Sequence, residues 1–398
     1  MPDITLQTIS IYPIKSSSGI QLSSSWVEEL GLAFDRRFVV ASPTGEMFTA
    51  RTEPRLCLIQ SNLTANGINI TAPGMPALLI EYAKLSDEYQ QVTVWDSTIH
   101  SQKGAEQYNQ WFTRYLGKPA QLLFFGENSE RFVKNKNSQV GFADGYPLLL
   151  ISQQSLADLN QKLSASNVVS MTQFRPNIVV DGCASFDEDT WKHIRIGEVE
   201  FEITTPCSRC IFTTINPETA EQHSQQEPLK TLMNYRQVES GDVMFGQNLV
   251  PLNQGQIKMG DKVEVLETKH PPVFIQRKKN NKSASHTVET NAAQTSAVQA
   301  SAEATKKPKI NFSSWNKEIT GNNKKSLLEQ GEDAGLLLPY SCRAGMCGRC
   351  KIKLESGDVE QTSTDGLSEK DKEQGYVLAC CSIPKSNVVL SKPSRPQR

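Results

Sequence analysis

The chain has 398 residues, too many for one ordinary domain and suitable for two or three. Its 42 Lys and Arg residues nearly balance 43 Asp and Glu residues, so the net charge of −1 gives no electrostatic reason to expect a nucleic-acid partner. No stretch approaches the roughly 18 apolar residues needed to cross a bilayer. The opening segment MPDITLQTISIYPIK also lacks the basic and apolar regions of a secretory signal. We therefore expect a cytoplasmic protein with no membrane or nucleic-acid partner.

Short runs rich in β-branched residues, separated by Gly, Pro and Asn turns, dominate residues 1–100. We expect strands at 5–12, 26–29, 37–41, 56–60, 68–70, 78–82 and 91–94. This pattern predicts a small β-barrel or sandwich, with Cys57 in the core of one apolar strand.

Residues 101–268 have a mixed pattern. Apolar residues recur at helical spacing in 105–116 and 154–163. Strand-like runs return at 177–180, 193–203, 211–215 and 262–266. We therefore expect a second, α+β domain in this part of the chain.

A polar segment at 272–308 separates this part from the rest. It is rich in Ala, Ser, Thr, Gln, Asn and Lys and has no aromatic residue after Phe274. Such a composition cannot bury enough apolar surface to offset the entropy of ordering. We interpret it as a flexible linker, and about 35 residues of this type span roughly 30–35 Å.

The last 90 residues, 309–398, contain a compact pattern of their own. Two strands at 310–312 and 317–320, a helix at 325–334, a cysteine-rich loop and strands at 351–354 and 388–390 suggest a β-grasp arrangement. The overall prediction is a mixed, β-rich fold.

Seven of the nine cysteines fall in two tight groups, which argues for metal ligands rather than disulfides. Cys342, Cys347 and Cys350 have the spacing C-x4-C-x2-C, and Cys380 follows after 29 residues. This is the ligand spacing of a plant-type [2Fe–2S] cluster. A zinc site is the alternative, but zinc ligands usually come as paired CxxC knuckles. The segment resembles plant-type ferredoxin domains, and the resemblance selects Cys380 rather than Cys381 as the fourth ligand.

Cys207 and Cys210 form a CxxC pair in a short loop between two expected strands. A thioredoxin-like dithiol would open a helix, whereas β-branched residues follow here. A second hypothesis is that both cysteines are buried, inert thiols. A thiolate ligand for a soft metal is the third and the one we favour, because Arg209 and its polar neighbours favour an ionised sulfur.

Residues 1–268 resemble the MOSC-domain molybdenum-cofactor proteins of the mitochondrial amidoxime reducing component and bacterial YcbX type, whose fold joins an N-terminal β-barrel to a β-barrel-like MOSC domain. The matching segments are YPIKS at 12–16, DRRF at 35–38, QFRPNI at 173–178, PCSRCIFTT at 206–214 and FGQN at 245–248. The resemblance implies the molybdenum cofactor, a molybdenum ion held by a pterin dithiolene, with Cys210 as its protein ligand. It also implies contacts of the cofactor's phosphate and pterin with Lys15, Ser16, Arg36, Arg175, Asn177 and Ser208.

The resemblance further places Asp144 on the substrate side as a possible proton handler, although an Asp before Gly also forms turns. Gly145 stands where the mitochondrial relatives carry Thr. Cys183 we expect to be structural.

The implied reaction is reduction of small N-hydroxylated compounds, with electrons passing from an NAD(P)H-dependent flavoprotein reductase through the [2Fe–2S] cluster to molybdenum. No nucleotide-binding motif is visible, so the donor is a separate protein. The alternative is an electron-transfer component of an oxygenase with a non-catalytic MOSC-like docking module. A sulfur-trafficking role is disfavoured because the chain has no room for a pyridoxal-phosphate lyase domain.

Overall fold

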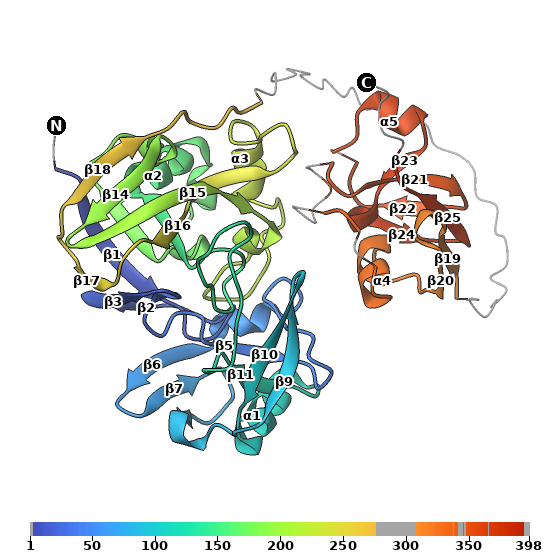
Figure 1. The fold of residues 1–398 in the computed structure, drawn as a ribbon. Helices are drawn as coiled ribbons and strands as arrows, with labels where there is room; N and C mark the ends of the chain where they lie inside the picture. Colours follow the sequence, from blue (N-terminus) through green and yellow to red (C-terminus); the bar gives the residue numbers. More distant parts are fainter. Residues whose placement is uncertain are drawn as a thin grey trace. The chain divides into compact units, whose positions relative to one another are not determined.

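A computed structural model describes residues 3–275, 307–336, 338–340, 345, 348–364 and 366–393. The chain forms two compact units, one of Met1–Val238 with Val243–Phe274 and one of Glu239–Asp242 with Ile275–Arg398. Most of the linker predicted at 272–308 lies outside the described residues. Figure 1 labels most of the helices and strands that follow.

The largest sheet of the first unit has eight strands. Their order is β18 (Val263–Thr268), β14 (Trp191–Ile196), β15 (Val199–Arg209), β16 (Val243–Pro251), β12 (Leu148–Ser152), β13 (Ile178–Asp181), β1 (Thr5–Ile11) and β2 (Ile20–Leu22). Only β12 and β13 run parallel, because helix α2 (Gln153–Lys162) connects them as a crossover. The amino-terminal strand β1 thus pairs with β13, about 170 residues away in sequence.

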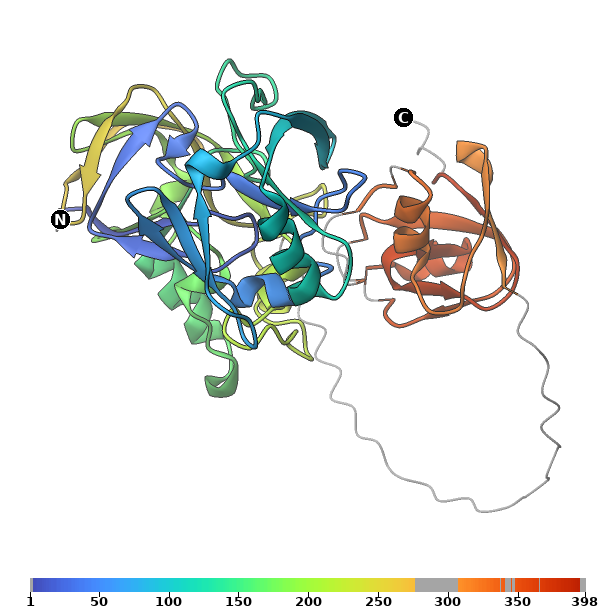
Figure 2. The same cartoon turned by 90° about the horizontal axis from the view of Figure 1, so that it is seen from below.

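Three smaller sheets complete the first unit. The first has the order β5 (Phe38–Ala41), β11 (Gln121–Phe124), β10 (Ser97–Lys103) and β9 (Tyr89–Val94). The second has the order β17 (Gly255–Lys258), β3 (Ser24–Glu28) and β4 (Gly31–Leu32). The third has the order β6 (Gln60–Thr64), β7 (Gly67–Thr71) and β8 (Leu78–Glu81). Helix α1 (Glu106–Leu116) packs on β11 and β8. Figure 1 shows α1 close to β9–β11, and Figure 2 shows the same unit turned by 90°. The third α-helix of this unit, α3 (Leu229–Met233), is short and has only five residues.

Local sequence explains the ends and faces of these helices. The buried residues of α1 recur at spacings of three and four, and Gly117 ends the helix with a positive φ of 71°. Ser152 caps α2 by accepting a hydrogen bond from the amide of Ser155. Both helices expected in this region from apolar spacing are therefore confirmed within one residue at each end.

The second unit has the predicted β-grasp order. Its five-stranded sheet runs β20 (Lys317–Thr320), β19 (Lys309–Phe312), β25 (Val388–Ser391), β21 (Lys351–Ser356) and β23 (Tyr376–Leu378), beside a pair β22 (Val359–Gln361) and β24 (Ser382–Pro384). Strands β19 and β25 are parallel at the centre. Helices α4 (Leu327–Asp333) and α5 (Glu369–Glu373) both begin with complete capping boxes, from Ser326 and Ser368. The β-rich fold class is confirmed.

Two strand predictions are wrong, and the run expected at 193–203 is split into the antiparallel hairpin of β14 and β15. Residues 56–58 lie in a 3-10 helix, η1 (Pro54–Leu58), which Pro54 favours by fixing φ at its first position, and only Gln60 begins a strand. Cys57 is therefore buried in a helical turn rather than in a strand. Residues 211–215 form η6 (Ile211–Thr214), because the hydroxyl of Thr213 bonds back to the carbonyl of Cys210 and that of Thr214 to Ile211.

Six further 3-10 turns connect the strands: η2 (Tyr82–Lys84), η3 (Ala165–Asn167), η4 (Met171–Gln173), η5 (Asp187–Asp189), η7 (Ser313–Trp315) and η8 (Ala379–Cys381). Within the described part of the chain, no helix has both the length and the apolar character needed to span a bilayer.

Candidate functional site

One open cavity of the first unit collects all the residues that the sequence assigned to the molybdenum cofactor. Its wall contains Lys15, Ser16, Arg36, Asp144, Arg175, Asn177, Ser208 and Cys210. They arrive from turns and strand ends between positions 15 and 210, so only the folded sheet brings them together. Cys207 lies on the same wall.

Three of these residues have an uncommon backbone conformation. Ser16, Arg36 and Arg175 have positive φ values of 72°, 46° and 58°. Non-glycine residues in this left-handed region are disfavoured sterically, and such residues cluster at functional sites. The tight turns direct the three side chains toward the same cavity.

A network centred on Tyr12 orders the two arginines. The Arg36 Nη1 donates to Asp35 Oδ2 at 2.6 Å and to Asn177 Oδ1 at 2.9 Å. The Cζ atoms of Arg36 and Arg175 lie 4.5 Å and 4.1 Å, respectively, from the centroid of the Tyr12 ring. These contacts hold two cations close together on one wall.

The Asn177 side chain makes its hydrogen bonds with other groups of the protein. Its Oδ1 also accepts from the amide of Leu149 at 3.2 Å, and its Nδ2 donates to the carbonyl of Ser10 at 3.1 Å. The Asn177 side chain therefore supports Arg36 and the adjoining backbone.

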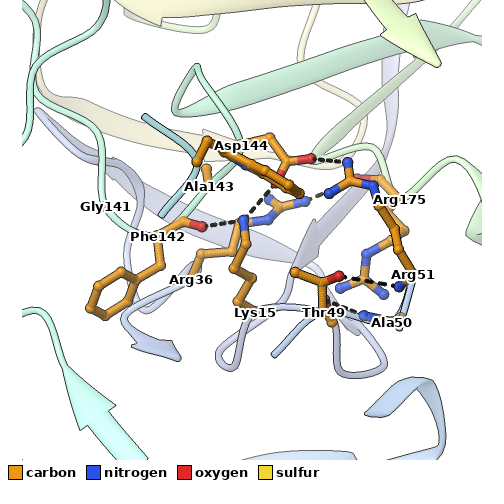
Figure 3. Close-up of polar contacts among 12 residues, drawn as sticks. Lys15, Arg36, Thr49, Ala50, Arg51, Gly141, Phe142, Ala143, Asp144 and Arg175 are labelled. Atoms are coloured by element: carbon orange, nitrogen blue, oxygen red, sulfur yellow. Dashed lines mark hydrogen bonds and ion pairs between the residues drawn. The ribbon is translucent and has the colours of Figure 1, made fainter. Parts of the chain in front are cut away.

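Asp144 is held by three donors. Lys15 Nζ lies 2.5 Å from its Oδ1, Arg51 Nη2 lies 3.1 Å from its Oδ2, and Trp95 Nε1 donates to Oδ1 at 3.2 Å. Figure 3 shows the carboxylate among these cations. Desolvation raises the pKa of Asp144, but the charges of Lys15 and Arg51 lower it by more, so that the pKa falls below its ordinary value. The carboxyl group is ionised at neutral pH.

Lys15 is the buried partner of this pair, with 6% of its side chain exposed. Its ammonium also donates to the carbonyl of Phe142 at 2.7 Å. Burial lowers the pKa of Lys15 to about 8, although Asp144 acts in the opposite direction. The ammonium therefore remains mostly charged at neutral pH but loses its charge within the mildly alkaline range.

Arg131 fixes the segment that carries Asp144. Its guanidinium donates to the carbonyls of Gly141, Ala143 and Asp144 at 3.0, 2.5 and 2.7 Å. Only 7% of the residue is exposed. This bracing keeps the Asp144 backbone in place at the cavity edge.

The two cysteines of the upstream pair have different surroundings. Cys210 precedes η6, and Arg51 Nε lies 3.0 Å from its sulfur. Cys207 belongs to β15, and burial raises its pKa more than Arg209 lowers it. The Arg209 guanidinium donates to the carbonyls of Phe245 and Phe174. The cation that contacts Cys210 is thus Arg51, and not the Arg209 that the sequence suggested.

The chemistry of this wall fits an anionic cofactor with a soft metal. The lining residues include five cations but only one carboxylate, that of Asp144. The cations are Lys15, Arg36, Arg51, Arg175 and Arg209. The buried Arg175 Nη2 has no hydrogen-bond partner within the described part of the chain, so it remains able to bind an acceptor. A cation excess suits a phosphate, and a thiolate suits molybdenum.

The second unit carries the other cysteine group. Cys350 and Cys380 approach with their sulfur atoms 3.1 Å apart, and Cys381 lies 3.7 Å from Cys380. Cys342 and Cys347 lie outside the described residues. Gly345 has a φ of 73°, and a Cβ there would meet the Cys381 sulfur at 2.6 Å, so the loop requires glycine at this position.

Comparison with known proteins decides the family. Family models match residues 3–119 as a MOSC N-terminal beta barrel domain, 137–264 as a MOSC domain and 312–385 as a 2Fe-2S iron-sulfur cluster binding domain. The human mitochondrial amidoxime-reducing component 1 is 34% identical over 282 residues, which are 66% of this chain and 83% of the relative. The chain belongs to the amidoxime-reducing component family.

Other members of the family give the same picture. The bovine mitochondrial amidoxime reducing component 2 is 34% identical over 65% of this chain and 82% of its own length. The zebrafish (Danio rerio) mitochondrial amidoxime-reducing component 1 is 31% identical over 64% of this chain and 82% of its own length. The MOSC domain implies a molybdenum cofactor, and the iron–sulfur domain implies a [2Fe–2S] cluster.

Sequence reasoning missed three residues that surround Asp144. Arg51, Trp95 and Arg131 all contact Asp144 or its segment. Arg51 lies in a turn before η1, Trp95 at the tip of the β9–β10 hairpin, and Arg131 in the segment between β11 and β12. An Arg or Trp in a turn carries no local signal, so only the fold identifies them.

Proposed function

We propose that this protein is a molybdenum-cofactor-dependent oxidoreductase that reduces small N-hydroxylated compounds. The reaction takes up two electrons and two protons, breaks the N–O bond and releases the reduced nitrogen compound and water. The observation that carries the proposal is the single cavity where Cys210, five cationic residues and Asp144 meet. When bound, the cofactor supplies a metal able to exchange two electrons.

The chain's residues take separate roles in this proposal. Cys210 supplies the thiolate that anchors the metal, and Ser208 lines the same strand end. Lys15, Ser16, Arg36 and Arg175 bind the phosphate and pterin, the arginines by forked hydrogen bonds and Lys15 as a point charge. Asn177 orients Arg36, since its own amide is already bonded.

Asp144 starts the reaction as a carboxylate, because Lys15 and Arg51 keep it ionised. As a carboxylate it cannot donate a proton at rest, and its lowered pKa makes it a weak proton acceptor, so any proton it takes up is passed on rather than held. Its fixed position next to the Cys210 side of the cavity supports this role.

Electrons reach the cavity through the chain's own [2Fe–2S] domain, whose cluster is held by Cys342, Cys347, Cys350 and Cys380. We propose an NAD(P)H-dependent flavoprotein reductase as the donor. In this proposal the β-barrel domain (1–100) and the MOSC domain (101–268) hold the molybdenum cofactor, and the ferredoxin-like domain (309–398) holds the cluster. Residues 272–308 form the flexible linker that joins the ferredoxin-like domain to the other two. A tether of this length gives an effective concentration on the order of millimolar. The cytoplasmic location stays a prediction.

Metal analysis combined with one substitution tests the function. Purified from a host that makes the pterin cofactor, the protein is expected to hold both molybdenum and iron and to reduce a model amidoxime. Cys210→Ser is expected to abolish that activity while the visible spectrum of the cluster stays intact. Iron without molybdenum in the unchanged protein would instead favour the electron-transfer component of an oxygenase.

A further inference from the structure

Arg51 occupies a position between the two groups to which the proposed function assigns the chemistry. Its Nε lies 3.0 Å from the Cys210 sulfur, and its Nη2 lies 3.1 Å from Asp144 Oδ2. One planar guanidinium therefore contacts both the thiolate and the carboxylate. The Arg51 side chain is only 14% exposed, whereas the Asp144 side chain is 60% exposed, so a largely buried guanidinium meets a carboxylate at the solvent-accessible edge of the cavity.

Trp95 holds this guanidinium from another element. The Arg51 Cζ lies 4.2 Å from the centroid of the Trp95 ring, and the indole Nε1 donates to Asp144 Oδ1 at 3.2 Å. Trp95 has a φ of 57°, which is rare for a bulky residue, so its hairpin tip holds a disfavoured conformation to present the ring.

The backbone next to Arg51 is also fixed to the cavity wall. The amide of Ala50 donates to the hydroxyl of Ser16 at 3.1 Å, and the amide of Arg51 donates to Thr49 Oγ1 at 3.3 Å. Figure 3 shows this segment next to Lys15 and Asp144. The turn is thus held at both its backbone and its side chain.

We propose that Arg51 is a positioning residue that sets the orientation of the Cys210 thiolate relative to Asp144, and that Trp95 locks Arg51 in place. This inference rests on the proposed function for its kinetic consequence, but its structural part concerns only Cys210 and its cation. Lysine could keep the charge but not the fork, because an ammonium cannot present two coplanar donors in fixed directions.

Arg51→Lys is the first test, with Arg55→Lys as its matched control. Arg55 lies in the same segment and stacks on Tyr115 at 4.5 Å, but it is absent from the cavity wall. Misplacing reacting groups by about 1 Å can cost on the order of a hundredfold in rate. We expect Arg51→Lys to lower kcat for a model amidoxime by about tenfold to a hundredfold, with KM within about threefold and with molybdenum content retained.

A readout other than activity separates positioning from general damage. The electron paramagnetic resonance signal of the one-electron-reduced molybdenum centre reports the orientation of its thiolate ligand. We expect shifted g-values in Arg51→Lys and an unchanged signal in Arg55→Lys. If the wild type holds molybdenum but does not reduce amidoximes, the proposed function fails, whereas the signal still tests Arg51.

Trp95 supplies the second pair of variants. Trp95→Leu removes the ring against Arg51 and is expected to reproduce the shifted signal, whereas Trp95→Phe keeps a ring there and is expected to change it less. An unchanged signal in both Arg51→Lys and Trp95→Leu overturns the proposal. Loss of molybdenum from Arg51→Lys with a folded, iron-loaded protein also overturns it, because Arg51 would then bind the cofactor rather than position its ligand.

Discussion

The two cysteine groups of this protein reach their sites in opposite ways. In the second unit, Cys350 and Cys380 come from a spacing that is visible in the sequence, and a nearby glycine loop with positive φ accompanies them. In the first unit, Cys210 is the single proposed thiolate ligand, and the cavity around it is lined by cationic side chains that come from positions 15 to 209 of the chain. A local motif can thus specify a cluster, whereas a cofactor bound through one sulfur needs the whole fold to assemble its surroundings.

The largest expected effect separates the two centres. Cys380→Ala is expected to remove the visible spectrum of the [2Fe–2S] cluster and to abolish turnover driven by a reductase. Amidoxime reduction with an artificial one-electron donor should persist, because Cys210 and its cavity belong to the other unit.

Cys381→Ala is the matched control, since Cys381 is the adjacent cysteine. It should retain the spectrum, whereas loss of the spectrum in Cys381→Ala but not in Cys380→Ala would assign the fourth ligand to Cys381. Loss of both activities in Cys380→Ala would contradict the independence of the centres.

A smaller effect is expected from Arg175→Met, which removes the guanidinium whose Nη2 has no hydrogen-bond partner among the described residues. Charge-assisted hydrogen bonds contribute about 1.5–3 kcal/mol each, so cofactor occupancy should fall by roughly tenfold to a hundredfold at limiting cofactor. Molybdenum per mole of protein, measured beside iron, gives the result. Arg37→Met serves as the control, because Arg37 pairs with Glu28 outside the cavity; equal occupancy in the two variants would rule out a cofactor role for Arg175.

A further effect concerns the pH dependence of stability in the cofactor-free protein. The folded-state pKa of Lys15 is lowered from 10.5 to about 8, so the unfolded chain binds more protons between these values. The contribution of Lys15 to the free energy of unfolding should therefore become more favourable as pH rises from about 8 to 10.5, and stay constant below 8.

Lys15→Met has no such group, so chemical denaturation of both proteins across this range isolates the effect. The wild type should gain stability relative to Lys15→Met as the pH increases. A constant difference between the two proteins would show that burial does not depress the Lys15 pKa.

The outcome for individual elements shows where sequence reasoning is reliable. Helix α1 was predictable because its five large buried residues repeat at helical spacing and Gly117 ends it. The strands predicted at 56–60 and 211–215 are wrong because short apolar runs do not distinguish a strand from a helical turn. Pairing of β1 with β13 has no local signature, because it joins segments far apart in the chain.

The sequence alone predicts the β-rich class and the [2Fe–2S] spacing, and its family resemblance implies Cys210 and the cofactor residues expected around it. These features lie in short motifs, where neighbouring residues fix both spacing and chemistry. Only the tertiary structure decided that Arg51 rather than Arg209 contacts Cys210, that Asn177 is already bonded, and that Asp144 is ionised. Each of these depends on which distant side chains share one buried wall, and charges and hydrogen bonds act through space rather than along the chain.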